Sequence, residues 1–377
     1  MTHPFGSPAD RPPTAERCAL VVCGTRPDAI KLAPVVLRLK EEPSIKTLVV
    51  GTGQHREMLD QVLSAFSIEL DENYAVMQER PDLARLTSAI LERLDETLER
   101  RMPAVVVAQG DTTTTFVASL AAFYRRIPFA HVEAGLRTAT IDRPFPEEFN
   151  RRATSLMTGL HFAPTEWAAG NLRREGIPEE RILVTGNTSI DALRLVLERT
   201  PKAPNREGRM LLVTTHRREN WGEPQRRIAR AVKRLLERFS DVHAVVPMHR
   251  NPVVREVLED ELGCERVELI EPPDYPGFAS LMAASHLILT DSGGVQEEAP
   301  SLGKPVLVLR EETERPEGVE AGAAILVGTD EDRIVLEASR LLEDEATYRA
   351  IAQVRSPYGD GHAAERIVAT LLDRFFR

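Results

Sequence analysis

Short apolar runs recur along the chain, and each is followed by a polar turn and then by a stretch with the apolar spacing of a helix. The first half has these runs at residues 19–22, 48–50, 104–107, 128–132, 160–162 and 182–184. The second half has them at residues 211–215, 243–247, 267–272, 287–289, 306–309 and 324–328. Strands that alternate with helices are typical of parallel α/β sheets, so the pattern predicts two successive arrays of this kind.

Two arrays predict two domains. A chain of 377 residues is too long for one compact core, and the proline-rich polar stretch 200–209 separates the arrays. We expect a loose tail over 1–16, a first domain over 17–187, a second domain over 188–360, and a C-terminal helix within 361–377 that packs back on the first domain. The predicted fold is therefore α/β, with two Rossmann-like domains facing a cleft.

The stretch 287–304, LILTDSGGVQEEAPSLGK, contains a candidate anion site. A strand that stops at Asp291 is followed by Ser292, two glycines and a helix predicted to begin at Val295. Free backbone N–H groups at the start of such a helix attract a phosphate, which is one interpretation. The other is that Ser292 caps the helix and that the two glutamates complement the helix dipole.

The strand ends of the first array carry charged residues. In chain order these are Arg26, Lys31, Asp111, His131 and Glu133, followed by Glu147 and Glu148 in a predicted loop. Carboxyl ends of parallel strands meet at one edge, so Asp111, Glu133 and Glu147 should share a cleft with Arg26. Clustered carboxylates separate their pKa values, which suits an acid and a base in one site. Alternatively, Asp111 caps the helix that follows it.

Histidine and arginine recur at the strand ends of the second array. His216 and Arg217 lie in HRREN, His249 lies in MHRNP, and Arg315 lies in REETERPE. Because these loops should lie at the same edge as the two glycines, the pattern favours a diphosphate pocket. In the first array, Gln54 and His55 open a helix and are candidates for ligand contact.

Composition narrows the possible partners. The net charge of −10 and the pI near 5.6 argue against a nucleic acid or an anionic membrane. No apolar run approaches the roughly 18 residues that span a bilayer, and the polar, proline-rich start does not resemble a signal peptide. The three cysteines lack metal-ligand spacing and predict reduced thiols in the cytoplasm.

No cofactor is expected. The GTG at residues 51–53 lacks the third glycine of the dinucleotide fingerprint. The acidic run 330–332 follows a strand and is interpreted as a helix cap, not as a metal site.

The motifs taken together resemble the non-hydrolysing UDP-N-acetylglucosamine 2-epimerases of bacteria. The matching strings, in order, are GTRPDAIKLAPV, GQHREMLDQVL, GDTTTTFVASLAAFYRRIPFAHVEAGLRT, FPEEFNRR, VTGNTSIDAL, HRREN, LTDSGGVQEEAPSLGKPVLVLREETERPE and YGDG. The resemblance implies a glycosyltransferase-B-like fold. It also implies a cytoplasmic homodimer that reversibly converts UDP-N-acetylglucosamine to UDP-N-acetylmannosamine for polysaccharide biosynthesis.

The resemblance also implies roles for individual residues. The implied catalytic residues are Asp111, Glu133, Glu147 and His216. The implied substrate-binding residues are Arg26, Ser292, Gly293, Gly294, Glu298 and Arg315, with Glu298 on the uridine ribose. Lys31, about one turn inside the first helix, can face the same crevice and is a further candidate for substrate binding. Positions that bind a second substrate molecule as an activator in some members correspond to Gln54, His55, Arg217 and His249. Asp28 stands where the family commonly has glutamate.

Epimerisation at C2 is difficult because no carbonyl acidifies the C2 proton. Elimination of UDP from C1 with removal of that proton gives a glycal, and re-addition on the other face inverts C2 without a cofactor. This route needs positive groups around the departing diphosphate and carboxylates near C2.

Four alternatives share this pattern. They are an epimerase for a related UDP-diacetamido-uronic acid sugar, a hydrolysing epimerase, a glycosyltransferase of the same fold, and a non-catalytic nucleotide-sugar-binding regulator. Fold alone does not separate them.

Overall fold

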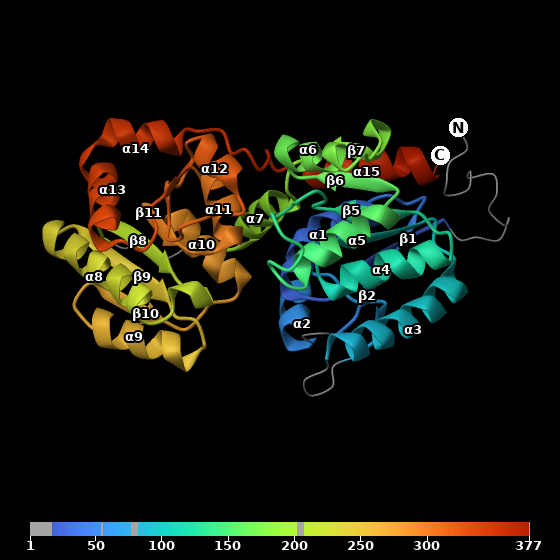
Figure 1. The fold of residues 1–377 in the computed structure, drawn as a ribbon, viewed down its shortest axis with the longest axis horizontal. Helices are drawn as coiled ribbons and strands as arrows, with labels where there is room; N and C mark the ends of the chain where they lie inside the picture. Colours follow the sequence, from blue (N-terminus) through green and yellow to red (C-terminus); the bar gives the residue numbers. More distant parts are fainter. Residues whose placement is uncertain (1–16, 54–55, 77–81, 202–206, 377) are drawn as a thin grey trace. The chain divides into compact units, whose positions relative to one another are not determined.

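The computed structural model describes residues 17–53, 56–76, 82–201 and 207–376. It divides the chain into two compact units (Figure 1). Unit 1 contains the chain up to Ala192 and again from Gly359, and unit 2 contains Leu193–Tyr358. Each unit has one parallel sheet flanked by helices, which confirms the predicted fold class of two Rossmann-like arrays.

The sheet of unit 1 has seven strands in the order β3-β2-β1-β4-β5-β6-β7. The strands are β1 (Cys18–Cys23), β2 (Lys46–Gly51), β3 (Glu72–Asn73), β4 (Val105–Gln109), β5 (Phe129–Val132), β6 (Leu160–Ala163) and β7 (Ile182–Val184). β1 pairs with β4, with Val21 opposite Val107. The strand order reverses between these two strands, so their carboxyl ends form the switch point where such sheets bind ligands.

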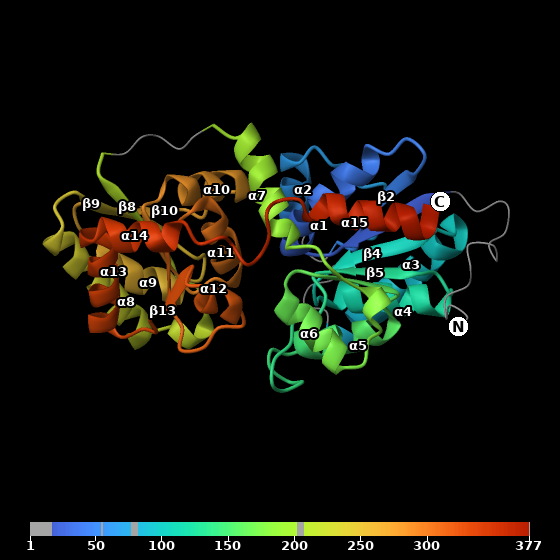
Figure 2. The ribbon, with the colours of Figure 1, turned by 90° about the horizontal axis from the view of Figure 1, so that it is seen from above.

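Helices cover both faces of this sheet. They are α1 (Arg26–Lys40), α2 (Arg56–Ala65), α3 (Leu83–Arg101), α4 (Thr113–Tyr124), α5 (Glu147–Met157), α6 (Glu166–Arg174) and α15 (Ala363–Leu371). Helix α7 (Thr188–Arg199) begins in unit 1 and ends in unit 2. Leu94 and Leu98 of α3 and Ala118 of α4 pack on Leu20 and Val106 of the sheet. The C-terminal helix α15 lies beside α1 (Figure 2).

The predicted loop at Glu147 and Glu148 is wrong. Both residues lie in the first turn of α5, where their negative charge is favoured by the helix dipole.

The sheet of unit 2 has six strands in the order β10-β9-β8-β11-β12-β13. The strands are β8 (Arg209–Thr214), β9 (Val242–Pro247), β10 (Val267–Ile270), β11 (Leu287–Thr290), β12 (Val306–Val308) and β13 (Ala324–Leu326). Here the order reverses between β8 and β11, which pair with Thr214 opposite Thr290. The switch point of unit 2 therefore lies at the ends of β8 and β11.

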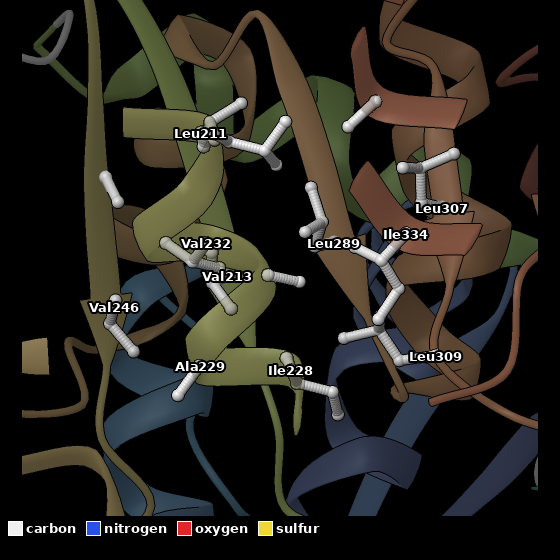
Figure 3. Close-up of a cluster of buried hydrophobic side chains, with 14 of the residues drawn as sticks. Leu211, Val213, Ile228, Ala229, Val232, Val246, Leu289, Leu307, Leu309 and Ile334 are labelled. Atoms are coloured by element: carbon white, nitrogen blue, oxygen red, sulfur yellow. The ribbon is translucent and has the colours of Figure 1, made fainter. Parts of the chain in front are cut away.

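The helices of unit 2 are α8 (Glu223–Arg238), α9 (Pro252–Leu262), α10 (Tyr275–Ala284), α11 (Gly293–Glu298), α12 (Pro316–Glu320), α13 (Glu331–Glu343) and α14 (Glu345–Ala352). Ile228 and Val232 of α8 and Ile334 of α13 pack on Val213 and Leu289 of the sheet (Figure 3). The acidic run 330–332 starts α13, and Asp330 accepts the Arg333 N–H as a cap. Within the described residues, no helix is both long and apolar enough to cross a bilayer.

Candidate functional site

The predicted carboxylates lie at the carboxyl edge of the unit 1 sheet, at the switch point and beside it. Asp111 follows β4 and Glu133 follows β5, and these strands pair side by side with Gln109 opposite Val132. The first turn of α5, with Glu147, is tied to this edge because Asn150 Nδ2 donates to the Asp111 carbonyl oxygen at 2.8 Å. The structure therefore brings the ends of β4 and β5 and the start of α5 together, and the cleft that these carboxylates would share with Arg26 stays a prediction.

Lys31 and Asn187 are among the donors that hold the Glu133 carboxylate. The Glu133 side chain is nearly buried and forms an ion pair with Lys31 of α1 through Oε2. Asn187 Nδ2 donates to the same oxygen at 3.0 Å. The backbone of Glu133 has a φ of 63°, a left-handed conformation that is uncommon outside glycine and is enriched at functional positions.

Asp111 is paired with an arginine. Arg151 of α5 contacts Asp111 Oδ2 through Nη2 at 2.7 Å and through Nε at 2.9 Å. Asp111 is not the helix cap that one interpretation proposed, because α4 is capped by Thr112, whose side chain accepts the Thr115 N–H. The Asp111 carboxylate is thus paired with the Arg151 guanidinium and does not cap α4.

Two buried groups support this edge. Asp28 accepts hydrogen bonds from Thr25 and from Thr112 Oγ1, and it links the start of α1 to the start of α4. Burial raises the pKa of Asp28 to about 6, although hydrogen bonds from Thr25 and Gly24 oppose the rise. His131 Nε2 donates to the Gly110 carbonyl oxygen at 2.7 Å, next to Asp111, and burial lowers its pKa to about 4.

The remaining predicted residues of this unit are less constrained. Arg26 begins α1 directly after the β1 turn and is half-buried, as is Glu147 at the start of α5. Gln54 and His55 lie outside the described residues.

The predicted anion site lies at the switch point of unit 2. Helix α11 begins at Gly293, two residues before its predicted start, because Ser292 rather than Gly294 ends the extended backbone. The Ser292 side chain makes no cap hydrogen bond, so the capping interpretation of its hydroxyl is wrong. The first N–H groups of α11 are therefore not capped by this hydroxyl.

Arg315 lies across this turn. A Cβ atom placed on Gly293 would lie 2.9 Å from Arg315 Cζ, so a side chain at this position would force the guanidinium to shift. Arg315 Nε donates to the buried Glu297 at 2.8 Å. Glu297 therefore holds the arginine. Glu298 accepts from Tyr275 Oη at 3.3 Å.

His216, at the end of β8, is oriented by Asp291, at the end of β11. His216 Nδ1 donates to Asp291 Oδ1 at 3.0 Å, so Nε2 is directed away from this carboxylate. Asp291 is fully buried and also accepts the N–H groups of His216 and Arg217 and the amide of Asn220. Burial alone would raise the pKa of Asp291, but these hydrogen bonds and the nearby His216 hold it below its usual range.

The His249 ring stacks near His216, with 6.1 Å between the ring centroids. Burial lowers the pKa of His249, and the neighbouring His216 lowers it further. His249 and Arg217, two of the predicted activator residues, thus adjoin the His216–Asp291 pair.

Sequence reasoning missed three supporting residues: Arg151, Asn187 and Asp291. Each lies in a string that was recognised, but its partner is far away in the chain. Arg151 is 40 residues from Asp111, and Asn187 is 54 residues from Glu133. The only available signal was position: Asp291 directly follows β11, and Asn187 lies in the short turn between β7 and α7.

Comparison with known proteins identifies the family. A profile for the family described as UDP-N-acetylglucosamine 2-epimerase matches residues 37–372. The chain belongs to this family. The UDP-N-acetylglucosamine 2-epimerase of Bacillus subtilis is 53% identical over 358 residues, which cover 94% of each chain.

Solved structures of this epimerase family agree with the fold. The crystal structure of UDP-GlcNAc 2-epimerase from Neisseria meningitidis bound to UDP-GlcNAc is 47% identical, with a TM-score of 0.87, and covers 94% of this chain and 100% of that chain. The co-structure of S. aureus MnaA with UDP is 44% identical, with a TM-score of 0.86, and covers 94% of this chain and 96% of that chain.

Proposed function

We propose that the protein is an isomerase that reversibly converts UDP-N-acetylglucosamine to UDP-N-acetylmannosamine. Membership of the epimerase family and the relative crystallised with UDP-GlcNAc support this substrate over a diacetamido uronic acid relative. The observation that carries the proposal is the pair of switch points, one rich in carboxylates and the other in positive groups and helix N–H donors.

Unit 2 would bind the UDP part of the substrate. The turn Ser292–Gly293–Gly294 and Arg315 provide backbone N–H groups and a guanidinium for the diphosphate, and His216 adds an imidazole at the same edge. As the C1–O bond breaks, its electron pair stays with UDP, and these donors stabilise the added charge. Glu298, beside Tyr275, is the proposed contact of the ribose.

Unit 1 would handle the proton at C2. In the elimination, one carboxylate accepts the C2 proton as the C1–C2 double bond forms. In the reverse addition, a proton is delivered to the opposite face of C2 as UDP returns to C1, so no net oxidation occurs. Asp111, Glu133 and Glu147 are the proposed acid and base groups, and Arg26 and Lys31 supply positive charge beside them.

Proton NMR of UDP-N-acetylglucosamine with the purified protein in heavy water tests this function. We expect UDP-N-acetylmannosamine to appear and deuterium to enter C2 of both sugars. Free N-acetylmannosamine with UDP would instead indicate a hydrolysing enzyme. Turnover to another product without exchange at C2 would indicate a glycosyltransferase, and no turnover would indicate a binding protein.

Activation by a second substrate molecule is a further part of the proposal. His249 stacks beside His216, and Arg217 donates its N–H to Asp291, so a ligand at these two residues would act on the His216–Asp291 pair. For Gln54 and His55, which lie outside the described residues, a role in activation stays a prediction from the resemblance. Sigmoidal dependence of the rate on substrate concentration, lost in Arg217→Ala, is the expected result.

The proposed assembly is a homodimer in the cytoplasm. Large apolar side chains are exposed on and before α5, including Leu156 at 84% and Phe145 at 69%, and such side chains are typical of interfaces. Light scattering after size exclusion should give twice the chain mass of 42.0 kDa. Leu156→Glu should give the monomer mass.

A further inference from the structure

The conformation of Glu133 requires support from its surroundings. Its left-handed backbone is unfavourable for a residue with a Cβ atom, and it turns the side chain away from the alternation of β5. A glutamate side chain has three rotatable bonds, so its carboxylate also needs partners to hold one orientation. One partner is Lys31, whose ammonium group is itself at the end of a flexible chain.

Asn187 is the more rigid partner. Its residue is 2% exposed, and its Oδ1 accepts the Ser189 N–H at 3.0 Å, which caps the first turn of α7. This cap determines which side of the amide carries the donor, because a flipped amide would point an NH2 group at an N–H group. Asn187 Nδ2 is therefore directed at Glu133 Oε2, 3.0 Å away.

The backbone of Asn187 is fixed by the C-terminal segment of unit 1. A Cβ atom on Gly359 would lie 3.2 Å from Gly186 Cα and 3.3 Å from Asn187 N, so the two backbones pack closely. Next to this contact, Arg366 donates to the Thr185 carbonyl oxygen at 2.9 Å. Further along, the Ala364 N–H donates to Asp191 at 2.8 Å. The return of the chain to unit 1 thus holds the turn that carries Asn187.

We propose that Asn187 is a positioning residue that orients the Glu133 carboxylate toward C2 of the substrate. The inference rests on the proposed function and deepens it. A neutral amide donor restricts rotation of the carboxylate and favours its ionised form without adding a charge. The C-terminal helix α15 acts on the same site indirectly, through the turn at Gly186 and Asn187.

Asn187→Asp removes the hydrogen bond that Asn187 donates to Glu133 but keeps the cap of α7. Aspartate has the same shape and caps a helix as well as asparagine does, but it has no donor for Glu133. We expect kcat for C2 deuterium exchange to fall by about 10- to 100-fold, as for other residues that orient a reacting group, with KM changed less than about twofold. The acid limb of the kcat–pH profile should move to higher pH, because two adjacent carboxylates resist full ionisation.

Three further variants complete the experiment. Asp330→Asn exchanges the same two residue types at the cap of α13 and should leave kcat and its pH profile unchanged.

Glu133→Gln combined with Asn187→Asp should be no slower than Glu133→Gln alone, because the positioned group is already lost. Asn187→Ser keeps a capping hydroxyl but is too short to reach Glu133, so it should lower kcat without shifting the acid limb. It replaces the aspartate variant if that variant does not fold.

The outcomes separate this inference from the proposed function. If the native protein shows no C2 exchange, the proposed function fails and the inference fails with it. If the native protein exchanges but the Asn187 variants match it in kcat and pH profile, only the inference is overturned. It is also overturned if the variants lose activity in proportion to a lower melting temperature, or if the loss adds fully to that of Glu133→Gln, because a purely structural role predicts both.

Discussion

Both sheets carry charged side chains where a strand ends and a helix begins, but the sign of the charge differs between the two units. At the β4 and β5 ends of unit 1, carboxylates stand at the edge, and the cations Lys31 and Arg151 hold them. At the β8 and β11 ends of unit 2, an arginine and a histidine stand at the edge, and the buried carboxylates of Glu297 and Asp291 hold them. In each unit, the charged side chains at the sheet edge therefore form ion pairs with side chains of the opposite charge.

We infer from this reversal a division of labour, in which the two units carry out different parts of the proposed reaction. A diphosphate leaving group needs positive charge, whereas proton transfer at C2 needs a group that can gain and lose a proton. The comparison predicts that substitutions at the carboxylates of unit 1 lower the rate of epimerisation without weakening UDP binding. Substitutions at the positive groups of unit 2 should weaken UDP binding first.

The largest effect is expected at the carboxylates of unit 1. Glu133→Gln and Asp111→Asn should each lower kcat by about 100-fold or more, the usual contribution of general acid–base catalysis. Deuterium exchange at C2 and the melting temperature are measured together. Exposed Glu99→Gln on α3 is the control, and near-native exchange in both site variants would remove these residues from the mechanism.

Asp291→Asn tests whether unit 2 needs its buried carboxylate. Asparagine has one acceptor oxygen instead of two and no negative charge, so its NH2 group would face either His216 Nδ1 or the donors of Arg217 and Asn220, and we expect kcat to fall by about 10- to 100-fold. Asp241→Asn, at an exposed ion pair with Arg209, should have no effect on steady-state rates. Equal rates for the native protein and Asp291→Asn would show that the pair does not serve the reaction.

Gly293→Ala tests the contact between the α11 turn and Arg315. The added methyl group would displace the guanidinium, so we expect KM to rise about tenfold, equivalent to about 1.4 kcal/mol. Gly294→Ala is the matched variant, because a Cβ atom there meets nothing within 4 Å, and its effect should be smaller. The opposite order would contradict the assigned role of Arg315.

The smallest effect concerns stability beneath the carboxylate edge. His131 and His161 are opposite each other on β5 and β6, and burial lowers the pKa of His161 to about 3 from 6.5. Below pH 6.5 the unfolded chain binds a proton that the folded chain excludes, so this stability is present above pH 6.5 and is lost as pH falls toward 3. His161→Phe should therefore melt with a weaker decline between pH 7 and pH 5. An unchanged decline would argue against a neutral His161.

The sequence predicted the strand–turn–helix corners because their signals are local. An apolar run, a glycine and a helical pattern lie within a few residues at Arg26, Asp111 and Ser292, and parallel pairing then places their strand ends at one edge of each sheet. The choice of cap at Asp111 or Thr112 could not be predicted, because both residue types cap helices and the decision came from Arg151.

The supporting residues were beyond sequence reasoning for a related reason. Asp291 looks like any aspartate after a strand until Asn220 and the His216 backbone are placed around it. The pairing of Glu297 with Arg315 has no local signal either, because the two residues are 18 positions apart. Pairing across elements depends on tertiary packing, which a single sequence does not specify residue by residue.

Calorimetric titration of UDP into Glu133→Gln and Arg315→Gln tests the division of labour most directly. Glu133→Gln should bind UDP with the native affinity, because its change lies at the proton-transfer edge. Arg315→Gln should bind UDP at least about tenfold more weakly, because a charge-assisted contact to the diphosphate is lost. Weakened binding in Glu133→Gln with native binding in Arg315→Gln would contradict the account.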